Sequence, residues 1–190
     1  MITNPSAACY DTLIKPAARW LEIPILLAFN LVLVASAYVA FNLPFSPVPV
    51  TAQTLAVLLV AMCLGKVRAT AVVAAYLAEG AAGLPVFAGG KAGLVAFAGP
   101  TGGYLLGFLA AAGVVGLLSD RGWHVSYVRS IVAMLIGTAA IFACGLAWLA
   151  AVMPGTSVLA IGLYPFLPGA AVKLVVAATV LPTVTRIVRR

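Results

Sequence analysis

Long apolar runs, separated by short stretches rich in proline, glycine or charge, limit how this chain can fold more than any other feature. The first run extends from Ile23 to Phe41 without a charged side chain. A helix that crosses a bilayer needs about 20 apolar residues, because each residue adds only about 1.5 Å. With 64% hydrophobic and 8% charged residues, the chain is far more apolar than a soluble protein. The sequence therefore predicts an integral membrane protein.

The apolar runs predict an all-α membrane fold with six transmembrane helices. We expect these spans at residues 24–41, 51–64, 67–78, 103–118, 128–152 and 168–187. They use almost the whole length, so residues 1–190 are expected to form a single six-helix membrane domain. The second and third spans are short and are separated by a predicted tight turn at residues 65–68. Gly103 and Gly107 have the spacing of a helix-packing face, although such spacings also arise by chance in an alanine-rich chain.

The basic residues predict the orientation of the six spans. Nine of the eleven Lys and Arg residues fall at alternate ends of the spans, namely Lys15, Arg19, Lys66, Arg68, Arg121, Arg129, Arg186, Arg189 and Arg190. Cytoplasmic loops carry an excess of basic residues, so we expect both termini in the cytoplasm. The outer connections are then residues 42–50, 80–102 and 154–167. This arrangement accounts for the net charge of +7 without a nucleic-acid-binding face, which needs basic residues gathered on one surface.

The N-terminal run has two features of a secretory signal peptide. Lys15 and Arg19 precede it, and Ala35-Ser36-Ala37 has the small residues of a cleavage site. The apolar run is longer than the 7 to about 15 residues of a signal-peptide core. We therefore expect it to be retained as the first transmembrane helix.

The predicted outer connection between the third and fourth spans is a Gly/Pro-rich loop. Residues 80–103 contain eight glycines and two prolines, which makes a regular helix improbable. Irregular backbone at membrane depth is tolerated only where it is buried in protein or lines a polar cavity. We expect this loop either to be buried in protein or to line a polar cavity.

Only four ionisable side chains are of functional interest, namely Glu22, Glu79, Lys91 and Lys173. An ionisable group in an apolar helix is a functional candidate because its burial is costly. Lys173 falls within the sixth span, where its ammonium either meets a ligand or extends to the outer surface. Lys91 lies in the Gly/Pro-rich loop, where it either meets an anion or is solvated. Glu79 is expected to cap local backbone or to pair with a lysine.

The remaining polar residues do not suggest catalysis. No paired carboxylates, Ser/His/Asp set or metal-spaced cluster can be assembled on the outer side. Cys9, Cys63 and Cys144 are far apart, and the lone His124 is interpreted as structural. The chain has no Gly-x-x-x-x-Gly-Lys-Ser/Thr loop, so energy from ATP would have to come from another chain. We expect a transporter of a small solute, not an enzyme, and no cofactor.

Four motifs occur in order along the chain: Pro47-Val48-Pro49-Val50-Thr51-Ala52-Gln53-Thr54, Gly83-Leu84-Pro85-Val86-Phe87-Ala88-Gly89-Gly90, Gly99-Pro100-Thr101-Gly102-Gly103-Tyr104, and Pro165-Phe166-Leu167-Pro168-Gly169 through Lys173. Together they resemble the BioY family, the biotin-binding S components of energy-coupling factor (ECF) transporters. The resemblance covers most of the chain. It implies a subunit of the cell inner membrane or plasma membrane that captures biotin outside and carries it into the cytoplasm. It also implies a transmembrane T component and two ATPase subunits as partners, although the chain could act alone.

The resemblance implies that the outer segments fold over a biotin site between the helices. The candidate site residues are Gln53, Lys91, Thr101, Gly102, Tyr104 and Lys173. The amide and the two hydroxyls can form hydrogen bonds with biotin, and Gly102 lets backbone approach it closely. Either Lys91 or Lys173 can meet the biotin carboxylate, and the sequence leaves this choice open.

One position departs from the family pattern. The last motif of the family reads Pro-Gly-Asp followed three residues later by Lys, whereas this chain has Ala170 at the aspartate position and keeps Lys173. If that aspartate accepts a ureido N–H, another group must replace it here, or affinity falls, or specificity shifts. A lost hydrogen bond to a charged group costs about 1.5 to 3 kcal/mol. An S component for a different vitamin is therefore the alternative function. An intramembrane enzyme and a structural assembly subunit are the alternatives from other classes.

Overall fold

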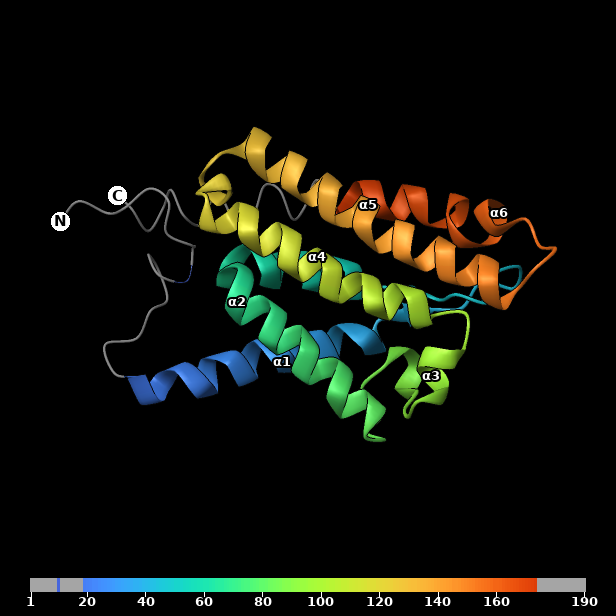
Figure 1. Cartoon of the computed structure of the whole chain (residues 1–190), viewed down its shortest axis with the longest axis horizontal. Helices are drawn as coiled ribbons and strands as arrows, with labels where there is room; N and C mark the ends of the chain where they lie inside the picture. Colours follow the sequence, from blue (N-terminus) through green and yellow to red (C-terminus); the bar gives the residue numbers. More distant parts are fainter. Residues whose placement is uncertain (1–9, 11–18, 174–190) are drawn as a thin grey trace.

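The structure is a computed structural model that describes Tyr10 and residues 19–173. Its elements, in chain order, are η2 (Arg19–Leu21), α1 (Glu22–Tyr38), β1 (Ala40–Phe41), β2 (Val50–Thr51), α2 (Gln53–Ala81), η3 (Ala88–Gly90), α3 (Val95–Ala98), α4 (Gly102–Asp120), η4 (Trp123–Val125), α5 (Tyr127–Val152), α6 (Val158–Gly162) and η5 (Tyr164–Phe166). The chain is helical again over residues 167–173. Helix α4 packs between α2 and α5, and α1 packs against α2 (Figure 1).

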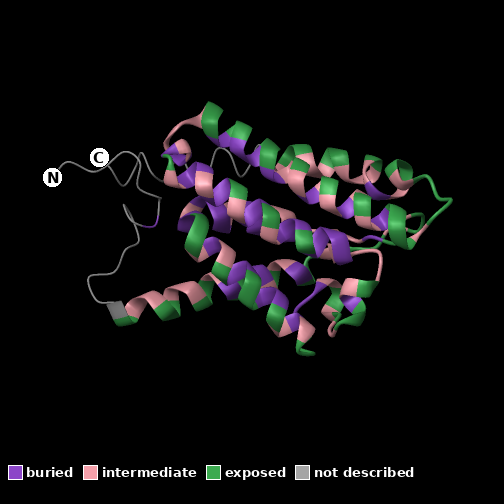
Figure 2. Ribbon diagram, viewed as in Figure 1, coloured by how far each residue is buried: buried purple, intermediate pink, exposed green. Residues whose placement is uncertain are grey.

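Three described helices, α2, α4 and α5, are long and apolar enough to cross a membrane. Helix α1 and residues 158–173 are shorter apolar helices. Large hydrophobic side chains such as Leu27, Leu31 and Leu135 are exposed, and exposed positions lie along the outer faces of α1 and α5 (Figure 2). An apolar outer surface of this kind suits contact with lipid tails. The six-span count stays a prediction, because most of the sixth span, residues 168–187, lies outside the described residues.

Helix α2 contains a sharp break at Gly65. The φ and ψ angles there are 76° and 178°, a conformation that side chains with a Cβ rarely adopt. The helical segments before and after the break correspond to the predicted second and third spans (Figure 1). The turn predicted at residues 65–68 is therefore shorter than expected, because a single glycine changes the chain direction and residues 66–68 are already helical.

A short two-stranded antiparallel sheet was not predicted and is a local addition to the mostly helical fold. Ala40 pairs with Thr51, and Phe41 pairs with Val50. Helix α1 consequently ends at Tyr38, three residues before the predicted end of the first span. The prolines of residues 42–49 prevent a helix there. The backbone on either side of them therefore satisfies its hydrogen bonds by pairing as strands.

The predicted absence of a regular helix in the Gly/Pro-rich loop is confirmed. Between α2 and α4 the chain forms only the single turns η3 and α3. The loop folds back onto α2 at Phe87, whose ring occupies the space where a side chain at Gly80 would lie. The Phe87 ring also makes edge-to-face contacts with Tyr76 and Phe97, each at a centroid distance of 5.5 Å. This aromatic cluster holds the loop over the C-terminal end of α2.

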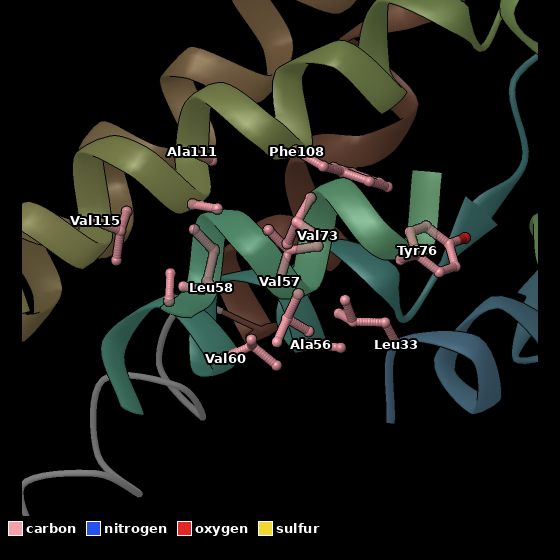
Figure 3. Packing of buried hydrophobic residues seen from close by; sticks show 14 of the residues in the cluster. Leu33, Ala56, Val57, Leu58, Val60, Val73, Tyr76, Phe108, Ala111 and Val115 are labelled. Atoms are coloured by element: carbon pink, nitrogen blue, oxygen red, sulfur yellow. The ribbon is translucent and has the colours of Figure 1, made fainter. Parts of the chain in front are cut away.

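The core lies mainly between α2 and α4. Val57, Leu58 and Val73 of α2 meet Phe108 and Ala111 of α4 (Figure 3). On another side of α4, a Cβ at Gly107 would lie 2.9 Å from Ile141 Cα, and one at Gly103 would overlap α5 near Trp148. The spacing of the two glycines therefore marks the α4–α5 contact, where close backbone approach requires small residues.

Candidate functional site

A largely apolar cavity lies among α2, α4, α5, the Gly/Pro-rich loop and the last described helix. Its lining residues are Val48, Pro49, Val50, Thr51, Gln53, Thr54, Leu55, Leu58, Phe87, Ala88, Lys91, Ala96, Thr101, Tyr104, Leu105, Phe108, Thr138, Ile141, Phe142, Phe166, Ala170 and Lys173. An apolar wall with a few placed polar groups is typical of a small-molecule site. All four motifs singled out in the sequence contribute to this wall.

Five of the six candidate site residues line the cavity. The exception is Gly102, which opens α4 and is buried away from the lining. A Cβ at this position would overlap the carbonyl of Phe97 and lie 3.0 Å from Trp148 Nε1. The same Trp148 nitrogen donates a hydrogen bond to Gly99 O at 3.0 Å. The structure thus gives Gly102 a packing role, because the absence of a side chain at Gly102 lets the loop before α4 approach α5.

Gln53 begins α2 and is buried, with its side chain directed at Tyr76 in the second segment of the same helix. Its Nε2 donates a hydrogen bond to Tyr76 Oη. Tyr76 Oη in turn donates to Val86 O at 3.0 Å, in the Gly/Pro-rich loop. The break at Gly65 brings the two segments of α2 together and makes this contact possible. Tyr76 was not among the predicted site residues, because it lies in an apolar span with no local motif.

The hydroxyls of Thr101 and Tyr104 already have partners in the protein. Thr101 Oγ1 donates to Ala96 O at 3.3 Å, and Tyr104 Oη donates to Gly162 O at 2.8 Å. A hydroxyl that donates its proton can still accept a hydrogen bond through its lone pairs. Both residues can therefore offer a ligand an acceptor while they hold the cavity wall in place.

The Lys173 ammonium is directed toward α2. Its Nζ donates to Thr51 O and, at 3.1 Å, to Thr54 Oγ1. The sequence leaves open whether this ammonium meets a ligand or extends to the outer surface; the two bonds hold it against the protein, where Lys173 lines the cavity. An ammonium has three donors, so one remains for a ligand after these two bonds. Ala170 also lines the cavity, one helical turn before Lys173.

Lys91 lies at the rim of the cavity and is exposed. It also lines an adjoining pocket together with Pro47 and Pro100. Its backbone pairs with Phe87, which fixes the position of the residue in the loop. Within the described part of the chain, neither Lys91 nor Lys173 forms an ion pair with a carboxylate. The cavity therefore offers uncompensated positive charge to a ligand.

Glu79, Glu22 and His124 are not among the residues that line the cavity. Glu79 Oε1 accepts a hydrogen bond from Asn30 Nδ2 of α1 at 3.0 Å. The expectation that Glu79 pairs with a lysine or caps local backbone was therefore wrong. Glu22 forms an ion pair with Arg68, with 2.8 Å between Oε1 and Nε. His124 is buried, and its Nδ1 lies 3.2 Å from Ser119 O. These contacts join helices and loops and leave the site to the two lysines.

Comparisons of the sequence with known proteins agree on one family. A sequence model of the BioY family matches residues 14–190. A biotin transporter BioY of Thermotoga maritima is 38% identical over 153 residues, which cover 80% of this chain and 88% of the relative. A biotin transporter BioY of Rhodobacter capsulatus is 36% identical over 171 residues, which cover 83% of this chain and 90% of the relative.

The fold also has a counterpart among solved structures. The crystal structure of the S-component for biotin from an ECF-type ABC transporter matches with a TM-score of 0.73. The alignment covers 90% of this chain and 95% of that chain, at 23% sequence identity. At this identity the likeness concerns the fold.

Proposed function

This chain belongs to the BioY family, and we propose on that basis that it is a multi-pass membrane subunit that captures biotin outside the cell and carries it into the cytoplasm. The observation that carries the proposal is the cavity, in which an apolar wall is combined with two lysines and a few oriented polar groups. Biotin has matching chemistry: a neutral ureido ring, an apolar thioether and chain, and a carboxylate.

The burial of the two lysines supports one orientation of biotin in the cavity. A carboxylate is strongly hydrated, and it is costly to bury without full compensation. Lys91 is exposed at the rim, where the carboxylate keeps contact with water. The ureido ring then lies deeper, where the free donor of Lys173 meets its carbonyl oxygen. Leu58, Phe108 and Ile141 enclose the apolar part between them.

The outer loops act as the cover of the proposed site. Residues 42–49 are tied to α6 by a hydrogen bond from Ser46 Oγ to Ile161 O at 2.7 Å. The Gly/Pro-rich loop is tied to α5 by the bond from Trp148 to Gly99. Both attachments are single side-chain contacts to backbone. Separation of these loops from α5 and α6 therefore breaks few interactions, whereas further contacts hold the Gly/Pro-rich loop to α1 and α2.

The proposed partners are a transmembrane T component and two ATPase subunits. The solved structure with the same fold is described as part of an ECF-type ABC transporter. This chain has no ATP-binding loop of its own in its sequence. We place the protein in the cell inner membrane or plasma membrane, with both termini in the cytoplasm. Action without these partners is the alternative, which expression with and without them would separate.

The second candidate is the same role for a different vitamin, and Ala170 is the observation that favours it. A family aspartate at this position would supply a charged acceptor for a ligand N–H. Its absence removes one determinant of specificity. The wall still contains the lysines and Gln53, so biotin remains the better-supported ligand.

Uptake of radiolabelled biotin tests the proposal. Bacterial cells that lack their own biotin importer would express the chain, with and without an ECF energising module. We expect saturable uptake that excess unlabelled biotin abolishes and that excess of other vitamins leaves unchanged. Lys66→Met, at an exposed helical position just after Gly65, serves as the control variant and should behave like the parent chain. Uptake no higher than in empty cells, with the protein present in the membrane, would contradict the proposal.

A further inference from the structure

The hydrogen-bond pattern around Tyr76 fixes the orientation of the Gln53 amide. A tyrosine hydroxyl has one proton, and that of Tyr76 is donated to Val86 O. Only lone pairs of the hydroxyl then face Gln53, so the group that approaches it must be the amide NH2. If the amide were turned over, Tyr76 would have to donate to Gln53. The carbonyl of the buried Val86 would then lose this partner, which is unfavourable.

This orientation leaves Gln53 Oε1 as an acceptor. Gln53 lines the cavity, and its Oε1 has no hydrogen-bond partner among the described residues. The surrounding wall is mostly apolar, and a ligand that fills the cavity excludes water from this oxygen. The acceptor is then satisfied only by a donor on the ligand itself. A ring N–H is such a donor, whereas a carboxylate would repel the oxygen.

We propose that Tyr76 is a positioning residue, which holds Gln53 so that Oε1 accepts a ureido N–H of the ligand and replaces the carboxylate absent at position 170. The inference rests on the proposed function, because it assumes a cyclic urea in the cavity. Tyr76 itself does not line the cavity and acts only through Gln53. Its fixed proton makes the site selective for a ligand that donates at this point.

Tyr76 could alternatively act only as a tether of the Gly/Pro-rich loop, and the chain contains a matched control for that role. Tyr38 Oη donates to Pro85 O at 2.6 Å, on the residue next to Val86. Tyr38→Phe therefore removes a tyrosine tether of the same loop without contact to Gln53. Comparing Tyr38→Phe with Tyr76→Phe separates the effect of losing a loop tether from the effect of losing the fixed orientation of the Gln53 amide.

The test is a double-mutant cycle on purified protein, read as the Kd of biotin. We expect Tyr76→Phe and Gln53→Leu each to weaken binding about tenfold, and Tyr38→Phe to stay within about twofold of the parent. The double variant Tyr76→Phe with Gln53→Leu should be no weaker than Gln53→Leu alone, because Tyr76 then has no amide to orient. Effects that multiply to about a hundredfold would assign Tyr76 a separate structural role and overturn the inference.

The wild-type titration separates failure of this inference from failure of the proposed function. If the parent chain binds biotin and Tyr76→Phe binds it equally well, the inference is wrong and the function stands. If the parent chain does not bind biotin, both are wrong. Should Tyr76→Phe not fold, Gln53→Glu takes its place in the test, because a carboxylate presents an acceptor in either orientation. It should bind biotin more tightly than Gln53→Leu, and equal loss in both variants would overturn the inference.

Discussion

At the scale of single residues, the two lysines of the cavity occupy different environments. Lys173 is half-buried and donates hydrogen bonds to Thr51 of β2 and Thr54 of α2, whereas Lys91 is exposed at the rim. A charge in contact with water suits a carboxylate, and a half-buried donor suits a neutral carbonyl oxygen. The proposed orientation accordingly places the ureido ring at Lys173 and the carboxylate at Lys91.

Methionine substitutions test this assignment because methionine keeps an unbranched apolar stem and removes the ammonium. Lys173→Met should weaken biotin binding by about 1.5 to 3 kcal/mol, or roughly tenfold to a hundredfold. The loss should be the same for biotin methyl ester, which keeps the ureido ring. Lys91→Met should weaken biotin binding but leave binding of the ester unchanged. Calorimetric titration of each variant with biotin and with its methyl ester checks this. The reverse pattern would place the carboxylate at Lys173.

Restoring the family's aspartate is a second test at this scale. Ala170→Asp places a carboxylate in the cavity wall, on the same helix face as Lys173. Biotin has two ureido N–H groups, so the new acceptor can serve the one that Gln53 does not. We expect the Kd of biotin to fall about tenfold, in line with a hydrogen bond to a charged group. Ala170→Asn, a neutral acceptor of similar shape, should give a smaller gain, and weaker binding by the aspartate variant would count against this placement.

The site could be predicted from sequence where a residue belongs to a motif, and not where its role depends on the folded chain. Gln53, Thr101 and Lys173 lie in recognisable motifs, and all three line the cavity. Tyr76 lies in a featureless apolar span and gains its role only when the break in α2 brings it to Gln53. Gly102 sits in a motif but packs against Phe97, because a glycine can permit close packing of backbone as well as approach to a ligand.

At the scale of helices, the break in α2 determines the geometry of the site. It allows residues 53–64 and 66–81 to form separate helical segments whose side chains meet at Gln53 and Tyr76. Gly116 of α4 packs closely against the break, since a Cβ there would lie 2.6 Å from Lys66 Cα. The break is thus held both by its own dihedral angles and by the neighbouring helix.

Gly65→Ala should destabilise the protein. A side chain at φ 76° and ψ 178° is strained by about 1 to 3 kcal/mol, which should lower the melting temperature in detergent by several degrees. Gly113→Ala in α4 is the matched control. A Cβ there meets only Thr70 Oγ1 at 3.9 Å, and alanine favours the helix over glycine. Equal melting temperatures for the two variants would show that the break tolerates a side chain.

The helices could be predicted from the apolar runs, but their ends and the sheet could not. Helix α5 matches the expected span 128–152 to within a residue, because its run is bounded by clear polar or proline-rich segments. Helix α1 ends early because Ala40 and Phe41 form hydrogen bonds with a strand that lies beyond the proline loop. Such pairing is non-local, and apolar periodicity carries no information about it. The same holds for α6, which lies in a stretch expected to be a connection.

At the scale of the whole molecule, capture of a solute outside the cell requires a defined orientation of the protein in the membrane. Thr156 lies in a predicted outer connection and Val67 lies in the predicted cytoplasmic turn, and both are exposed. In a background without Cys9, Cys63 and Cys144, Thr156→Cys should react with an impermeant thiol reagent in intact cells. Val67→Cys should react only after the membrane is permeabilised, because the basic residues beside it favour the cytoplasm. The opposite labelling would invert the topology.

The central claim is that this chain by itself recognises biotin, and equilibrium binding to the purified protein tests it most directly. The detergent-extracted chain, freed of any co-purified ligand, would be titrated with biotin and with a panel of other water-soluble vitamins. The account predicts saturable binding of one biotin per chain and no comparable binding of the other vitamins. Tighter binding of another vitamin, or no binding of biotin by folded protein, would contradict it.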